Sequence, residues 1–217
     1  MYDIVHTAND VLKERYILGA ELSGKYGIPK LKKINADVNG LKSVPFSEAR
    51  KEKNPKKSVV HCFLDDCKFE TLWREPMKSI ETIFNFKYVI PPDFSFYSDM
   101  PLSLQIYQVY RMRAIHHFLS ETGIQCIPVV GWSGEESFDF CFDGLPEGST
   151  LAVSTNGCFA KSGMECYRKG FSEMCNRLNP KRVIVVGKEI EVKEDVEIQY
   201  LDSFCQSMKK RLETDNG

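Results

Sequence analysis

The sequence lacks the segments that send a chain out of the cell or into a membrane. Its first ten residues contain no basic region followed by an apolar one, which a secretory signal would need. The chain also has no run of about 18 apolar residues, the length that a transmembrane helix requires. No tract combines low hydrophobicity with high net charge, so we expect disorder only at ends and in loops. At 217 residues, 42% of them hydrophobic, the chain is long enough for one domain with a sizeable core. We expect a cytoplasmic protein.

The sequence also lacks the short motifs of several enzyme classes. It contains no G-x-x-x-x-G-K-[ST], no G-x-G-x-x-G and no G-x-S-x-G. These absences argue against a P-loop nucleotide hydrolase, a standard dinucleotide-binding fold and the usual serine hydrolase. There is no internal repeat or low-complexity tract either.

Metal-ligand spacings are missing as well. Of the four histidines, His116 and His117 are adjacent, so on a helix they point about 100° apart and cannot chelate one ion. No Cys-x-x-Cys pair occurs, so we expect no structural zinc site and assign no residue as a metal ligand. The eight cysteines are expected to be reduced and mostly buried, because disulfide frameworks belong mainly to short secreted chains. Cys62 or Cys67 as a thiol nucleophile has no recognisable histidine partner.

From residue 58 onward, short β-favouring runs alternate with helical stretches. The predicted strands are residues 59–64, 88–90, 124–130, 151–153 and 182–186, with 196–200 as a further candidate. The predicted helices are residues 69–84, 102–121, 135–142 and 164–178, and Ser98 or Asp99 is expected to cap the second of them. Strands separated by helices indicate βαβ crossovers and hence parallel pairing.

This pattern predicts a single α/β domain with a largely parallel sheet. Two closures fit: an irregular or incomplete (β/α) barrel, and an open doubly wound sheet. We favour the barrel, because polar residues follow nearly every predicted strand. In a doubly wound sheet we would expect them mainly at the single point where the strand order reverses. Residues 58–217 form the α/β part, and residues 1–57 are a basic, partly irregular segment packed on it, with a short helix within 8–23 and a strand within 40–46.

The net charge of −1 hides an asymmetry between these parts. Residues 1–57 hold 12 Lys and Arg against 7 Asp and Glu, so the segment carries +5 and the remainder −6. Residues 25–33 and 50–57 contain the basic clusters, which would suit phosphate or another acidic surface. A solvated basic loop is the interpretation we favour here, because Glu48 and Glu52 interrupt the second cluster.

The candidate functional residues follow the predicted strands. In parallel α/β folds, ligands bind at the carboxyl ends of the strands, where loops and helix N-termini converge. That rule gathers carboxylates, small polar groups, an aromatic and a lysine: Asp65, Asp66, Asp93, Ser95, Trp132, Ser133, Ser154, Asn156 and Lys188. We also consider Asp99 and Arg113 as substrate-binding residues, since Arg113 lies on the long helix and its planar fork suits an anion.

Each candidate also has an ordinary structural role open to it. An aspartate after a strand often caps the next helix or makes a turn, and Trp132 can fill the end of the core as well as stack on a sugar or base. A helical arginine such as Arg113 more often faces solvent or pairs within the fold. For Asp65, Asp66 and Asp93, the chemical alternatives are Mg²⁺ binding, or general-acid and nucleophile roles divided by different pKa values.

Five short motifs resemble a family of uncharacterised phage and mobile-element proteins known only as a domain of unknown function (DUF4417-like). The motifs are PDFSFYSDMP at residues 92–101, YRMR at 110–113, IPVVGW at 127–132, FDFCFDGLP at 138–146 and STNG at 154–157. The similarity extends from about residue 26 to residue 187. It implies a prokaryotic or phage setting and an accessory role, such as nucleic-acid metabolism or interference with a host factor, but assigns no catalytic residue.

Two hypotheses follow. The first is an enzyme, a hydrolase or transferase, that uses Asp66, Asp93 and Asp65 on a glycosyl, nucleotide or phosphate-bearing substrate oriented by Trp132 and the small polar groups. The second is a noncatalytic factor whose basic N-terminal segment binds nucleic acid or a host protein. The sequence specifies no cofactor and no oligomeric state.

Overall fold

The computed structural model describes residues 1–215 of the chain. Its centre consists of two three-stranded parallel sheets: β3 (Lys42–Pro45), β4 (Ser58–Cys62) and β5 (Tyr88–Pro92) in the first, and β6 (Thr150–Ser154), β7 (Arg182–Val186) and β8 (Glu197–Leu201) in the second. Every residue of β4 and β7 is buried, as expected for parallel strands that are covered on both faces. The predicted α/β class with parallel sheets is confirmed.

An irregular extended segment, residues 124–130, joins the two sheets. Val89 of β5 bridges to Cys126, and Ala152 of β6 bridges to Val129. Between these bridges lies Pro128, which has no N–H to donate, so the segment cannot form a regular ladder with either neighbour. The strands therefore follow one another in chain order from β3 to β8, without the reversal that defines a doubly wound sheet.

The array of strands does not close into a barrel. Within residues 1–215, β3 and β8 are the outer strands, and side chains rather than a backbone ladder connect them. The Ser43 hydroxyl, for example, donates a hydrogen bond of 2.6 Å to the carbonyl oxygen of Asp202. The described part of the chain thus contains no closed barrel, but two parallel sheets that are connected through residues 124–130.

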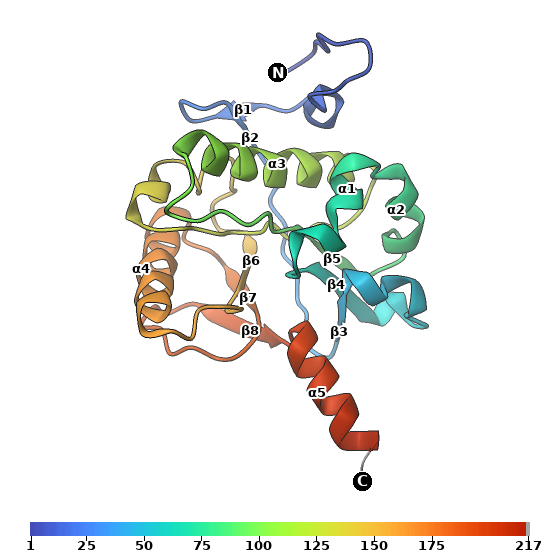
Figure 1. Ribbon diagram of the computed structural model, residues 1–217, viewed down its shortest axis with the longest axis vertical. Coiled ribbons are helices and arrows are strands. Elements are labelled where there is room, and N and C mark those ends of the chain that lie inside the picture. Colours follow the sequence, from blue (N-terminus) through green and yellow to red (C-terminus); the bar gives the residue numbers. More distant parts are fainter. Residues whose placement is uncertain (216–217) are drawn as a thin grey trace.

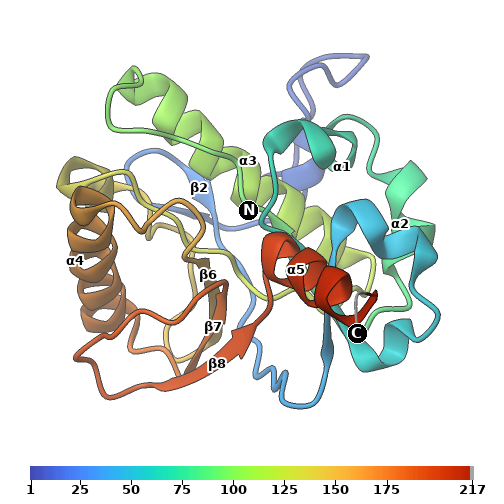
Figure 2. The same ribbon diagram turned by 60° about the horizontal axis from the view of Figure 1, so that its bottom comes forward.

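Helices surround the strands (Figure 1). The short helices α1 (Glu70–Arg74) and α2 (Met77–Ile83) flank the first sheet, α4 (Lys161–Leu178) flanks the second, and α3 (Leu102–Glu121) crosses above both. After β8, α5 (Phe204–Asp215) runs in front of the half that contains α1 and α2, as Figure 2 shows. The smaller elements are η1 (Glu14–Ile17), β1 (Leu22–Ser23), β2 (Ile28–Pro29), η2 (Phe46–Lys51), η3 (Pro55–Lys57), η4 (Asp66–Lys68) and η5 (Glu135–Asp139). No helix within residues 1–215 has the length and apolar character needed to cross a membrane.

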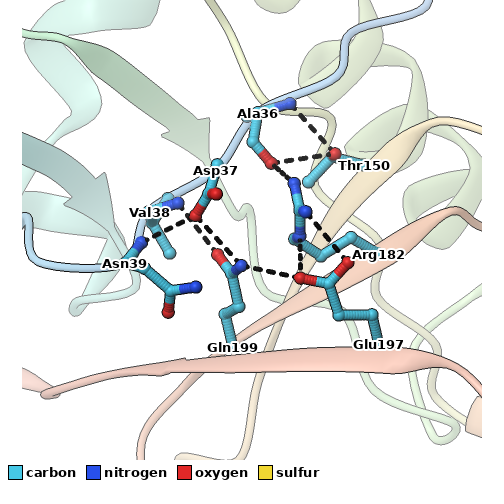
Figure 3. A network of polar contacts seen from close by, with 8 residues as sticks. All are labelled: Ala36, Asp37, Val38, Asn39, Thr150, Arg182, Glu197 and Gln199. Carbon is cyan, nitrogen blue, oxygen red and sulfur yellow. Dashed lines mark hydrogen bonds and ion pairs between the residues drawn. The ribbon is translucent and has the colours of Figure 1, made fainter.

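Polar contacts tie the N-terminal segment to the second sheet (Figure 3). The Arg182 guanidinium donates to the carbonyl oxygen of Ala36 and forms a two-point ion pair with Glu197, at 2.7 and 2.9 Å. The Gln199 side-chain oxygen accepts from the amide of Val38 at 2.8 Å. Because this segment continues directly into β3, residues 1–57 supply a strand of the first sheet as well as a covering layer.

Some predicted elements differ from the structure. The helix expected within residues 8–23 is wrong: only η1 forms, and Asp10 and Lys13 before it have positive φ angles of 47° and 60°, which a helix does not allow. The helix expected over residues 69–84 is split into α1 and α2, because Pro76 forces Glu75 out of the helical region, to φ −146°. The patch at 135–142 is the shorter η5.

The start of α3 is formed differently from the prediction. Neither Ser98 nor Asp99 caps it. Pro101 occupies the N-cap position and makes no side-chain cap. The Gln105 side chain instead donates to the Met100 carbonyl oxygen at 2.9 Å and so holds the entry to the helix.

Candidate functional site

A cavity of 660 Å³ opens at the carboxyl ends of the strands, and we call it the strand-end cavity. Its walls come from the segments that follow β4, β5, residues 124–130, β6 and β8, together with one residue of α4. They are Phe63, Leu64, Asp65, Lys68, Asp93–Tyr97, Val130–Trp132, Val153, Ser154, Asn156–Cys158, Tyr167, Phe204 and Cys205. The size is typical of small-molecule sites, which span roughly 300–1,000 Å³.

The cavity gathers most of the residues expected at the strand ends. Six of the predicted site residues line it: Asp65, Asp93, Ser95, Trp132, Ser154 and Asn156. Asp66 lies directly beside it and contacts Ser95. Four other candidates are not among the lining residues: Asp99, Arg113, Ser133 and Lys188. The rule that polar strand ends meet at one edge therefore brought six of the nine strand-end candidates to the cavity.

Asp93 occupies the floor of the cavity, immediately after β5. One carboxylate oxygen lies against Gly131, so closely that a Cβ on that glycine would stand 3.3 Å from it. Among the side chains that the structure describes, no hydrogen-bond donor reaches the Asp93 carboxylate, although the residue is only partly exposed. A buried carboxylate without a partner is costly unless it is protonated or meets a ligand.

The surroundings of Asp93 favour its protonated form. Burial and the nearby charge of Asp66 raise its pKa from 3.8 to about 7, and the positive charge of Arg113 opposes this only in part. Asp93 therefore exchanges its proton near neutral pH, the range in which a general acid or base is most effective.

Asp66 has a different role. Its carboxylate accepts hydrogen bonds from the Ser95 hydroxyl at 2.8 Å and from the Ser95 amide at 3.2 Å. The Ser95 carbonyl oxygen in turn accepts from the side chain of Gln108 on α3 at 2.9 Å. Asp66 thus fixes the loop that carries Asp93 and supplies the charge that raises the pKa of Asp93.

Asp65 stands at the rim of the cavity. Its carboxylate is 76% exposed and pairs with Lys68 at 3.0 Å. An exposed pair of this kind contributes little to stability, and both charges stay accessible to a ligand. Asp65 and Lys68 therefore present a polar edge to the cavity.

The loop after β6 forms a second polar wall. The Ser154 hydroxyl is occupied within the fold, because it donates to the Val186 carbonyl oxygen and accepts from the Asn156 amide, both at 3.1 Å. The Asn156 side chain is exposed, and its NH₂ group reaches the Phe63 carbonyl oxygen only at 3.5 Å. Asn156 is therefore the member of this loop whose side chain has spare capacity for a ligand.

Trp132 combines both roles that the sequence left open. Its indole N–H donates to the Cys166 carbonyl oxygen at 3.1 Å, and its ring packs against the backbone of Gly170 on α4. The rest of the ring lines the cavity beside Tyr167, with the two ring centroids 5.6 Å apart. Trp132 thus anchors α4 and offers part of an aromatic wall to a planar group.

Arg113 and Asp99 do not take the positions expected for substrate contacts. Arg113 is 1% exposed, and its guanidinium donates to the carbonyl oxygens of Val129, Cys141 and Asp143 at 2.8 to 3.2 Å. Burial lowers its pKa to about 10, so it remains charged at neutral pH and affects the cavity only through its field at Asp93. Asp99 is exposed, outside the cavity lining.

Cys158 and Cys62 are poor nucleophiles. Cys158 lines the cavity, but burial raises its pKa to about 11, and burial likewise raises the pKa of Cys62, which is 1% exposed. Cys67 is exposed and lies outside the cavity lining. Among residues 1–215, no three potential metal-ligating side chains of His, Cys, Asp or Glu come together.

Several lining residues were missed at the sequence level. Lys68 and Cys158 lie two or three residues beyond candidates that were identified, so a wider window after each strand would have found them. Tyr167 comes from the middle of α4, and Phe204 and Cys205 come from α5, a helix that the sequence reading did not include. No local pattern identifies residues that reach a site from a neighbouring helix.

Comparison with known proteins shows a family match and similarity to two phage proteins. A family model described as a domain of unknown function (DUF4417) matches residues 20–203. The Gene 1 protein of Mycobacterium phage L5 is 33% identical over 180 residues, covering 82% of this chain and 78% of that protein. The Gene 1 protein of Mycobacterium phage D29 is 32% identical over 167 residues, covering 76% of this chain and 62% of that protein. No solved structure matches.

Proposed function

The chain belongs to the DUF4417 family, and we propose that it is an enzyme in which Asp93 is the general acid–base group of the strand-end cavity. The observation that carries this proposal is the Asp93 carboxyl group itself: it lines a cavity, accepts no hydrogen bond from any side chain or amide that the structure describes, and has a pKa of about 7. Perturbed carboxyl groups of this kind concentrate at catalytic sites.

The cavity walls favour a polar substrate that contains a planar ring. Trp132 and Tyr167 supply aromatic surface on one side, and Asn156, Asp65 and Lys68 supply polar groups around the opening. A glycosyl, nucleotide or other phosphate-bearing compound matches this combination, with the Lys68 ammonium available to a phosphate oxygen.

The chemistry that follows is hydrolysis or group transfer. Protonated Asp93 gives its proton to the oxygen of the leaving group as the bond to that oxygen breaks, and it regains a proton from the water or alcohol that attacks. Asp66 does not touch the substrate in this scheme. It positions the loop after β5 and keeps the pKa of Asp93 high. We place this activity in a phage or mobile-element setting in the cytoplasm, in line with the phage relatives.

Turnover by the full chain tests the proposal. The probes are p-nitrophenyl glycosides, nucleotides and bis(p-nitrophenyl) phosphate near pH 7, each with and without Mg²⁺. Asp93→Asn should lower turnover of any accepted probe by about 10²–10⁴-fold while the fold is retained. The matched control is Asp195→Asn, which neutralises an exposed carboxylate on the loop before β8 and should leave turnover unchanged.

Asp66→Asn separates the positioning role from direct catalysis. Removal of the Asp66 charge lowers the pKa of Asp93, so the acid form of Asp93 is lost at a lower pH. The alkaline limb of the pH–rate profile should therefore move to lower pH. Turnover that is equal in wild type and Asp93→Asn would refute the proposal, and so would an Asp93 carboxyl group that titrates near pH 4 by ¹³C NMR.

A further inference from the structure

Six exposed basic side chains gather around the connection between β3 and β4 and the start of β5. They are Arg50, Lys51, Lys53, Lys56, Lys57 and Lys87, and we call them the basic surface. Lys87 belongs with the others because its backbone amide donates to the carbonyl oxygens of Pro55 and Ser58, both at 3.1 Å. A residue from a distant part of the chain thus extends the cluster that the sequence shows at 50–57.

The two glutamates that interrupt this cluster in the sequence do not interrupt it in space. Glu48 is 22% exposed and pairs with Arg211 of α5 at 2.6 Å. Glu52 is 5% exposed and pairs with Lys42 of β3 at 2.5 Å. Each glutamate is neutralised by a cation outside the basic surface. The reason for preferring an ordinary solvated loop therefore no longer holds.

Among the side chains that the structure describes, none of the six cations of the basic surface forms an ion pair. Lys51 lies near enough to Glu48 to help lower the pKa of that glutamate, and the Lys87 ammonium lies 5.5 Å from the ring centroid of Tyr88. Some exposed lysines elsewhere are paired, for example Lys30 with Glu21 and Lys169 with Glu135. The net charge of the chain is −1, so the positive potential here comes from segregation of charge.

We propose that the basic surface binds the phosphate backbone of nucleic acid. Clustered, unpaired lysines are point charges that suit a row of phosphates without reading base sequence. Lys57 immediately precedes β4 and Lys87 immediately precedes β5, so these residues lie at the amino ends of the strands, opposite the strand-end cavity. Binding at this surface leaves the cavity open, and the inference does not depend on the proposed catalytic role of Asp93.

Fluorescence anisotropy with the full chain tests the inference. The probes are a labelled duplex of about 25 base pairs with arbitrary sequence and its single strand, titrated at salt concentrations from about 50 to 200 mM. Each phosphate contact contributes about −0.9 to the slope of log K against log salt concentration. With about five contacts, affinity for the duplex should therefore fall roughly 10²–10³-fold over this range. For the single strand the slope is about −0.7 per contact. Comparison of the two probes shows whether the surface prefers double-stranded or single-stranded nucleic acid.

The decisive variant combines Lys53→Gln, Lys56→Gln and Lys57→Gln. It should reduce the magnitude of the salt slope by about 3 and weaken binding at low salt by at least about tenfold. The matched control combines Lys30→Gln, Lys32→Gln and Lys169→Gln, which removes the same charge from paired lysines elsewhere and should bind like wild type. Asp93→Asn should also bind like wild type.

Several results would overturn the inference. These are no binding of either probe at low salt, an equal loss in the control triple variant, and loss of binding in Asp93→Asn, which would place the nucleic acid in the cavity. Capture of phosphatidylserine vesicles without any binding of nucleic acid would likewise reject it, in favour of a membrane surface.

Discussion

Asp93 couples the stability of the fold to pH. Its pKa is about 7 in the folded protein against 3.8 for an ordinary aspartate, so between pH 4 and 7 the folded chain keeps a proton that the unfolded chain releases. The contribution of Asp93 to the free energy of unfolding therefore falls as pH rises through that window. Above pH 7 the folded protein bears the whole cost of keeping this carboxylate ionised in its partly buried site. The residue that carries the proposed chemistry is one that the fold would be more stable without.

Asp93→Asn should accordingly stabilise the protein at pH 8 and have little effect at pH 4. A pKa change of one unit corresponds to about 1.4 kcal/mol, so we expect a gain on the order of 2–4 kcal/mol in the free energy of unfolding at pH 8. Urea denaturation at the two pH values measures it. Asp195→Asn, at an exposed site, should change neither value, and a loss of stability in Asp93→Asn at pH 8 would contradict the raised pKa.

At the scale of elements, the contact between Trp132 and α4 sets one wall of the cavity. Replacing a helical glycine by alanine usually stabilises a helix by about 1 kcal/mol. Gly170 is an exception, because a Cβ there would stand 2.2 Å from the Trp132 ring. Gly170→Ala should therefore destabilise the protein by about 1–3 kcal/mol and move the tryptophan.

Thermal unfolding of Gly170→Ala, Trp132→Leu and the double variant checks this prediction. The smaller leucine leaves room for the new methyl group, so the double variant should lose less stability than the sum of the two single changes. Strictly additive losses would show that Trp132 and Gly170 are not in contact.

The elements that the sequence predicted well are those whose signals are local. The strands β4 and β7 are short runs rich in valine, and α3 begins after Pro101 and ends two residues before Gly123. Composition and the residues that start or stop a helix therefore locate them. The site followed from one further step, because parallel strands bring their carboxyl ends to one edge.

The remainder depends on contacts between distant parts of the chain. The pairing of Glu52 with Lys42 and the insertion of Arg113 among three carbonyl oxygens cannot be read from neighbouring residues. From sequence spacing alone, Arg113 was predicted to bind a ligand, and Glu52 was predicted to interrupt the basic cluster.

At the scale of the whole molecule, the two sheets are joined into one core. Buried residues from both halves form a single cluster, and residues 36–38 run from contacts with β7 and β8 into β3. Arg182 is central to this connection, because it binds the Ala36 carbonyl oxygen and Glu197 together (Figure 3). Loss of its guanidinium should therefore weaken both sheets and not only the second.

Arg182→Met should lower the free energy of unfolding by about 1–3 kcal/mol. It removes the charged donor from the buried Ala36 carbonyl oxygen, which keeps only the Thr150 hydroxyl, and it takes the ion-pair partner from Glu197. The two tryptophans report the two halves separately: Trp73 on α1 lies beside the first sheet, and Trp132 packs on α4 beside the second. In urea, Trp73→Phe and Trp132→Phe backgrounds should each show a single transition, and Arg182→Met should shift both equally. If only the Trp132 signal moved, the sheets would unfold as independent units, and residues 36–38 would be a tether and not part of a common core.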